Sequence, residues 1–87
     1  MIEKKITVTA GDDEFEFCVK TNDYNSYINA LKPDDKIAPS SNFLRRTLVD
    51  KEKLEKLNAL IDAGVGIDIA SSIINEFRPE VEIAVKE

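Results

Sequence analysis

The stretch Ile6–Val19, ITVTAGDDEFEFCV, decides the fold of this 87-residue chain. Apolar and polar residues alternate on both sides of a central Gly-Asp pair, which is typical of two strands that bury one face. A two-residue Gly-Asp loop suits a type II′ turn, in which glycine takes the positive φ. This turn gives two apolar cross-strand pairs, Val8 with Phe15 and Ile6 with Phe17. The turn chemistry and the hydrophobic pattern therefore predict the same register for a β-hairpin.

Beyond the hairpin, apolar residues spaced three or four apart predict three to four short helices. Their expected buried stripes are Tyr24, Tyr27, Ile28 and Leu31; Phe43, Leu44, Thr47 and Leu48; Leu54, Leu57, Leu60 and Ile61; and Ile69, Ala70, Ile73, Ile74 and Phe77. We expect Ser40 or Ser41 to cap the second helix and Asp50 to cap the third. A Gly-Val-Gly sequence at 64–66 should end the third helix.

A third strand is predicted at Glu80–Lys86, where Val81, Ile83 and Val85 share one face. The predicted fold class is α+β. The hairpin and the C-terminal strand would form a three-stranded antiparallel sheet with helices on one face. At this length we expect one domain, residues 1–87. Such a sheet leaves a strand edge free, so self-association stays open.

The composition argues against several functions. The chain has no histidine, one cysteine and no glycine-rich phosphate loop. It therefore lacks an imidazole base, a zinc-ligand set and a nucleotide motif. The acidic runs at 12–14 and 34–35 lack the frame of an EF-hand loop. We expect no catalysis, no metal and no cofactor, and a small enzyme or ligand binder is the weakest alternative.

The formal net charge is −5, which argues against non-specific nucleic-acid binding. Residues 40–56 form a basic island whose five cations are Arg45, Arg46, Lys51, Lys53 and Lys56, against three acids. This island is either a solvated helix surface or a contact patch for an acidic partner. We see no secretory signal at the start, and acidic residues interrupt the most apolar region, 57–77. We therefore expect a cytoplasmic protein outside the membrane.

The segment Asn22–Asp50 is rich in aromatic, amide and proline residues and supplies the candidate partner-binding site. The candidates are Tyr24, Asn25, Asn42, Phe43, Arg45 and Arg46. The alternative for the tyrosines is a core role with a solvated hydroxyl, and for the asparagines it is capping or bridging of backbone segments.

The same segment also carries a resemblance to a known family. Its pattern is Tyr24-Asn25-x-Tyr27-x-Asn29, Pro33-x-x-Lys36-Ile37-Ala38-Pro39 and Asn42-Phe43-Leu44-x-Arg46-Thr47. With this pattern the chain resembles the tail assembly chaperones encoded in the tail operons of tailed phages and prophages. None of the matching positions is catalytic.

The resemblance implies a non-catalytic assembly factor in the host bacterial cytoplasm. Such a protein would hold the tape measure protein until tail tube subunits polymerise around it, and would be absent from the mature virion. The tail tube protein is a second candidate partner. Two alternatives stay open: a minor structural or tail-completion protein, and a regulator directed at a host protein.

Overall fold

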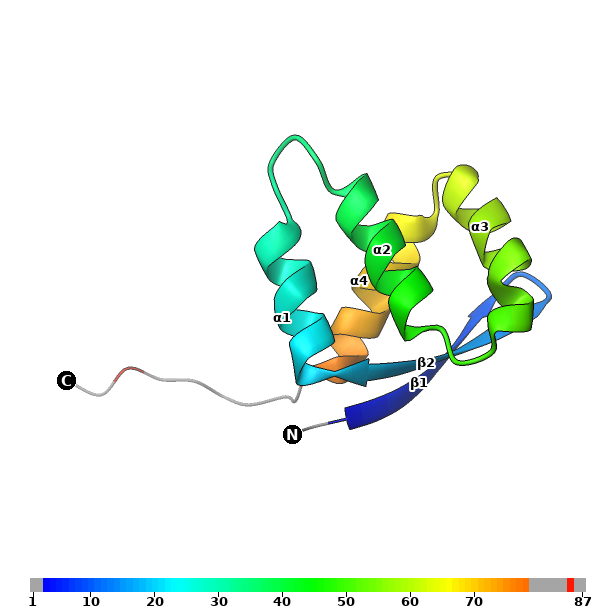
Figure 1. The fold of residues 1–87 in the computed structure, drawn as a ribbon, viewed down its shortest axis with the longest axis horizontal. Helices are drawn as coiled ribbons and strands as arrows, with labels where there is room; N and C mark the ends of the chain where they lie inside the picture. Colours follow the sequence, from blue (N-terminus) through cyan, green and yellow to red (C-terminus); the bar gives the residue numbers. More distant parts are fainter. Residues whose placement is uncertain (1–2, 79–84, 86–87) are drawn as a thin grey trace.

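The computed structural model describes residues 3–78 and 85, and Figure 1 shows its arrangement. The elements are β1 (Glu3–Ala10), β2 (Asp13–Lys20), α1 (Thr21–Ala30), α2 (Ile37–Thr47), the 3₁₀ turn η1 (Lys51–Lys53), α3 (Leu54–Asp62) and α4 (Gly66–Phe77). The hairpin runs along one side of the helices. Helix α2 lies between α1 and α3, and α4 lies behind α2 (Figure 1). The prediction of an α+β chain with an N-terminal hairpin is confirmed.

The hairpin has the predicted register. Val8 pairs with Phe15, and Ile6 pairs with Phe17. Gly11 has a φ of 64°, while no residue other than glycine has a positive φ in the described chain, as a type II′ turn requires. The inward face of the hairpin is apolar and fully buried at Phe15 and Phe17. This face packs against the helices, which gives a two-stranded sheet the support that it needs in water.

One hydrophobic core joins the hairpin to the helices. Its buried members are Ile6, Phe15, Phe17, Val19, Tyr27, Phe43, Leu44, Leu48, Leu57, Ile69, Ala70, Ile73 and Ile74. Helix α2 is central to this core, since it packs against α1, α3, α4 and β2. The predicted stripe of α3 is only partly buried, because Leu57 alone is buried in that helix.

The predicted three-stranded sheet is wrong: the sheet of the described residues has two strands, β1 and β2. The expected strand Glu80–Lys86 lies outside the described residues apart from Val85, which is 87% exposed and belongs to no strand. Alternation indicates that a segment can form a half-buried strand, but it specifies no partner for that strand. Here the helices cover the apolar face of the hairpin, and the residues after α2 meet the edge of β2. The bridge of Phe17 with Leu48 marks that meeting.

The predicted serine caps of the second helix are also wrong. Helix α2 begins at Ile37, so Pro39 lies in its first turn. Proline has no backbone N–H, but the N–H groups of a first turn have no carbonyl partner within the helix, so no hydrogen bond is lost. Ser40 and Ser41 are therefore helical and buried. The Ser40 hydroxyl is bonded to the Tyr27 hydroxyl at 3.2 Å, and Ser41 Oγ donates to the Ile37 carbonyl at 2.9 Å.

The predicted ends of the third helical segment are confirmed. Asp50 Oδ1 accepts from the Glu52 N–H at 3.0 Å and caps η1, which leads into α3. At the other end Gly64 has a φ of 93°. The Gly64 N–H donates to the Ile61 carbonyl at 3.0 Å, and the Val65 N–H donates to the Leu60 carbonyl at 3.2 Å. These two bonds form a Schellman motif, in which glycine supplies the positive φ.

Replacing Gly64 by alanine should lower the free energy of unfolding by about 1–2 kcal/mol, because a side chain at positive φ is strained. A Cβ at this position would have no heavy atom within 4 Å, so backbone strain is the only expected cost. Urea denaturation measures the change. Gly64→Asn should lose less than Gly64→Ala, since asparagine tolerates this conformation better. Equal stability of the wild-type chain and Gly64→Ala would contradict this account of the turn.

Candidate partner-binding surface

Of the two aromatic candidates from the sequence, Phe43 is buried in the core and Tyr24 is partly buried against it. The Tyr24 ring stacks on the Phe77 ring, with centroids 5.5 Å apart. Phe43 is 2% exposed, and its ring centroid is 4.9 Å from that of Tyr27. Both side chains therefore stabilise the packing of α1 against α2 and α4. A partner has no access to Phe43 in this arrangement.

A small cleft between α1 and α2 brings together three of the candidates. Asn42, Phe43 and Arg46 line it, and its volume is about 60 Å³. Asp23 of α1 lies at the same place, and its Oδ1 is 3.8 Å from Nη1 of Arg46. The remaining exposed candidates, Asn25 and Arg45, are not part of this cleft.

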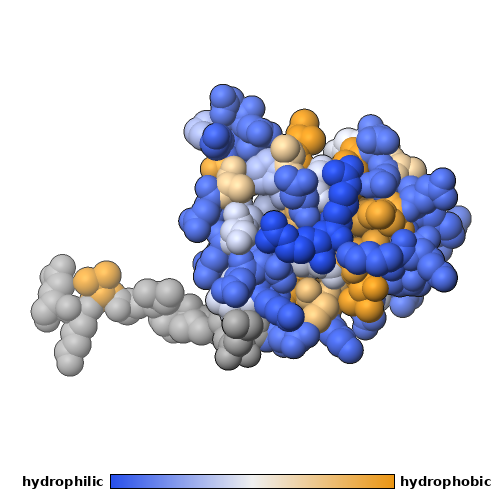
Figure 2. Space-filling view, viewed as in Figure 1, coloured by the Kyte–Doolittle hydropathy of each residue, from blue (hydrophilic) through white to orange (hydrophobic). Residues whose placement is uncertain are grey.

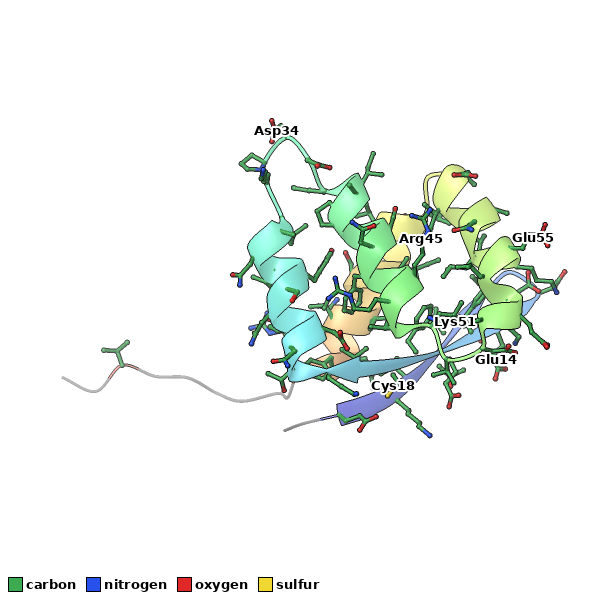
Figure 3. The ribbon with its side chains drawn as sticks, viewed as in Figure 1. Glu14, Cys18, Asp34, Arg45, Lys51 and Glu55 are labelled. Carbon is green, nitrogen blue, oxygen red and sulfur yellow. The ribbon has the colours of Figure 1, made fainter. Side chains whose placement is uncertain are left out.

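Arg45 faces the opposite side of α2. Its Nε–H donates to Oδ1 of Asn58 in α3 at 2.9 Å, and Figure 3 shows Arg45 between α2 and α3. Successive residues of an α-helix point about 100° apart, which separates Arg45 from Arg46. The two arginines therefore do not form one cationic rim.

The other cations of the basic island bond to neighbouring elements. Nζ of Lys51 donates to the Arg45 carbonyl at 2.8 Å, and Nζ of Lys53 donates to the Glu14 carbonyl. Nζ of Lys56 is 3.3 Å from Oδ1 of Asp13 in the hairpin. In Figure 2 a strongly hydrophilic band crosses the face formed by α2 and α3, with hydrophobic residues on both sides. The island thus links α2, η1 and α3 to each other and to the hairpin while its side chains stay at the surface.

An apolar cavity of about 270 Å³ lies where α2, α3 and α4 meet, and the sequence analysis did not find it. Its lining residues are Ile37, Ser41, Ile61, Asp62, Gly64, Gly66 and Ile67. Ile37 is 66% exposed, the most exposed large apolar residue of residues 3–78. Gly66 is buried without a side chain, and a Cβ there would lie 3.3 Å from Cγ1 of Ile61. No single stretch of the sequence marks this cavity, because residues of α2, α3 and α4 form it together.

A second apolar cavity, of about 190 Å³, lies between α1 and α4. Its lining residues are Tyr27, Ile28, Leu31, Ser71, Ile74 and Asn75, none of them charged. Ile28, on its rim, is 42% exposed. The protein therefore has exposed isoleucines beside two different cavities, and no basic residue lines either of them.

Cys18 lies half-buried on β2, on the face away from the core (Figure 3). Its Sγ–H donates to Oε1 of Glu3 at 2.7 Å. This hydrogen bond raises the pKa of the Cys18 thiol, and partial burial and the charge of Glu3 act in the same direction, while Lys20 and Lys5 lower the pKa. The thiol is therefore less ionised at neutral pH than an ordinary cysteine.

Replacing Glu3 by alanine should lower the pKa of Cys18, because both the acceptor and the negative charge are removed. At pH 8 the larger thiolate fraction should speed alkylation by iodoacetamide, since the thiolate is the nucleophile. Rates measured from pH 7 to 10 give the pKa directly. Lys5→Ala is the matched control, and it should shift the pKa in the opposite direction. An unchanged pKa in Glu3→Ala would contradict the assigned cause.

Other kinds of site find no support in the part of the chain that the structure describes. No three histidine, cysteine, aspartate or glutamate residues of that part lie together as a metal site would need. Within the same residues, no single helix is long and apolar enough to cross a bilayer. The segments 51–62 and 66–77 reach the required length and composition only as a pair, and that pair is bent by 114°.

The described residues form a small α+β domain with an apolar cavity between its helices and a basic island at its surface. The sequence model of one family, phage tail assembly chaperone, matches residues 6–87. The chain belongs to this family. The comparisons with curated proteins and with solved structures give no match. The family supports tail proteins as partners and a role in the host cell during assembly, and it favours a non-enzymatic function.

Proposed function

We propose that this protein binds the tape measure protein during tail assembly and keeps it soluble until tail tube subunits polymerise around it. The family match over residues 6–87 carries this proposal. Binding would be reversible and non-catalytic, and it would take place in the cytoplasm of the host bacterium. This chain would dissociate from the tape measure protein before the particle is complete.

The described surface is compatible with this role. A protein that shields an amphipathic partner needs accessible apolar surface, and the cavity at Ile37 supplies it. The basic island adds cations that would favour acidic stretches of a partner. An 87-residue chain also has a small stability margin, so partner binding would raise its apparent stability.

Co-expression with the tape measure protein of the same tail operon tests the proposal. We expect the tagged chain to co-purify with the tape measure protein and to raise the soluble fraction of that protein. The matched control is co-expression of the tape measure protein with the empty vector. The proposal fails if the tape measure protein is equally soluble in both cultures and does not co-purify.

A further inference from the structure

The face between α2 and α3 combines an apolar cavity with a cation on one stripe of a helix. Ile37, Ser41 and Arg45 follow each other at intervals of four residues along α2. At 1.5 Å per residue, Ile37 and Arg45 are about 12 Å apart along the helix axis. Ile37 and Ser41 line the cavity, and Arg45 reaches α3 through Asn58. We call this surface the Ile37 groove.

We propose that the Ile37 groove binds an amphipathic helix of the tape measure protein, an inference that rests on the proposed function. An aliphatic side chain of that helix would enter the cavity. An acidic side chain about two turns away would meet Arg45. Docking of an amphipathic helix into an apolar groove is a common mode of recognition, in which anchors recur at turns of the bound helix.

The charge of Arg45 favours an acidic residue at the facing position of the bound helix. Arg45 uses its Nε–H for Asn58, and among the described residues its terminal nitrogens have no hydrogen-bond acceptor. A guanidinium presents these donors in a fork that matches a carboxylate. Lys51 lies beside Arg45, bonded to its carbonyl, and adds positive charge. A helix with basic residues at this position would be repelled.

The cavity has the properties of an anchor pocket. Its volume of about 270 Å³ is several times the roughly 30 Å³ share of one water molecule. Asp62 lies on its rim and is the one charged residue that lines it. Gly64 and Gly66 form its wall without side chains, so the backbone turn between α3 and α4 keeps the space free. The negative charge of Asp62 disfavours an acidic side chain beside the anchor, so the acidic residue of the bound helix belongs two turns away, at Arg45. The cavity between α1 and α4 is also apolar, but no charged residue lines it.

Ile37→Asp tests the apolar anchor without harming the fold. Ile37 is the first residue of α2, where a negative charge interacts favourably with the helix dipole. Peptides that tile the tape measure protein are titrated with the full chain by fluorescence anisotropy, and the tightest-binding peptide is kept as the probe. We expect Ile37→Asp to weaken its binding by about 30-fold or more, the range of an interface hot spot.

Ile28→Asp is the matched control, since it places the same charge on the other exposed isoleucine. Its affinity should stay within about threefold of the wild-type value, because substitutions outside hot spots have small effects. Arg45→Glu should weaken binding about tenfold at low salt, with a smaller loss at high salt, because added salt screens exposed charges.

The outcomes separate this inference from the proposed function. Wild-type affinity in Ile37→Asp, or an equal loss in Ile28→Asp, would overturn the groove while co-purification still supports the proposed function. If the wild-type chain binds none of the peptides, helix docking is overturned. The co-expression experiment decides the proposed function independently. Loss confined to Ile37→Asp and Arg45→Glu, with thermal unfolding unchanged in all variants, is the result that we expect.

Discussion

Phe43→Ala is expected to lower the free energy of unfolding by about 3–5 kcal/mol, the usual cost of deleting a buried aromatic ring. Phe43 is 2% exposed and packs on Tyr27, so alanine would leave a cavity between α1 and α2. A domain of 87 residues has a total stability of about 4–13 kcal/mol. The variant should therefore lose a large share of its stability, which urea denaturation followed by circular dichroism would measure.

Asn42→Ala is the control for this substitution, because Asn42 is the exposed neighbour of Phe43 on the same helix. Its stability should stay within about 0.5 kcal/mol of the wild-type value. The pair distinguishes a core role for Phe43 from the partner contact that the sequence suggested. A Phe43→Ala chain with wild-type stability and no partner binding would contradict the core role.

Phe17→Ala should be similarly destabilising, by about 3–5 kcal/mol. Phe17 is fully buried, pairs with Ile6 across the hairpin and forms a bridge with Leu48 after α2. It therefore connects the sheet to the helices, and a two-stranded hairpin without that packing is marginal in water. For a domain of this size the midpoint of thermal unfolding should fall by about 12 °C or more.

Glu16→Ala provides the control for Phe17→Ala, since Glu16 is the preceding residue and points to the exposed face of β2. Its thermal midpoint should lie within about 4 °C of the wild-type value. A fall of the same size in both variants would show that strand propensity, rather than core packing, accounts for the loss.

The hairpin could be predicted in detail because its determinants are local. A Gly-Asp turn and alternating residues specify the register without knowledge of the rest of the chain. The same holds for the Asp50 cap and for the end of α3 at Gly64. The serine caps failed because Pro39 is compatible with a first helical turn, which allowed α2 to begin at Ile37, with Lys36 rather than a serine at the N-cap.

The surface was harder to predict because burial depends on the tertiary arrangement. Phe43 has the same chemistry in a core as on a binding face, and only the packing of α1 on α2 decides between them. Arg45 and Arg46 are adjacent in the sequence, yet they bond to residues on opposite sides of α2. The cavity at Ile37 forms from three helices and has no signature in any one of them.

The most direct test of the central claim compares tape measure complexes with finished particles. Tagged tape measure protein is isolated from cells during tail assembly, and completed virions are purified from the same culture. Quantitative mass spectrometry then measures the amount of this chain per tape measure protein in each sample. We predict that the chain is abundant in the intracellular complexes and absent from the virions. Equal amounts in both samples, or absence from the complexes, would contradict a chaperone of the tape measure protein.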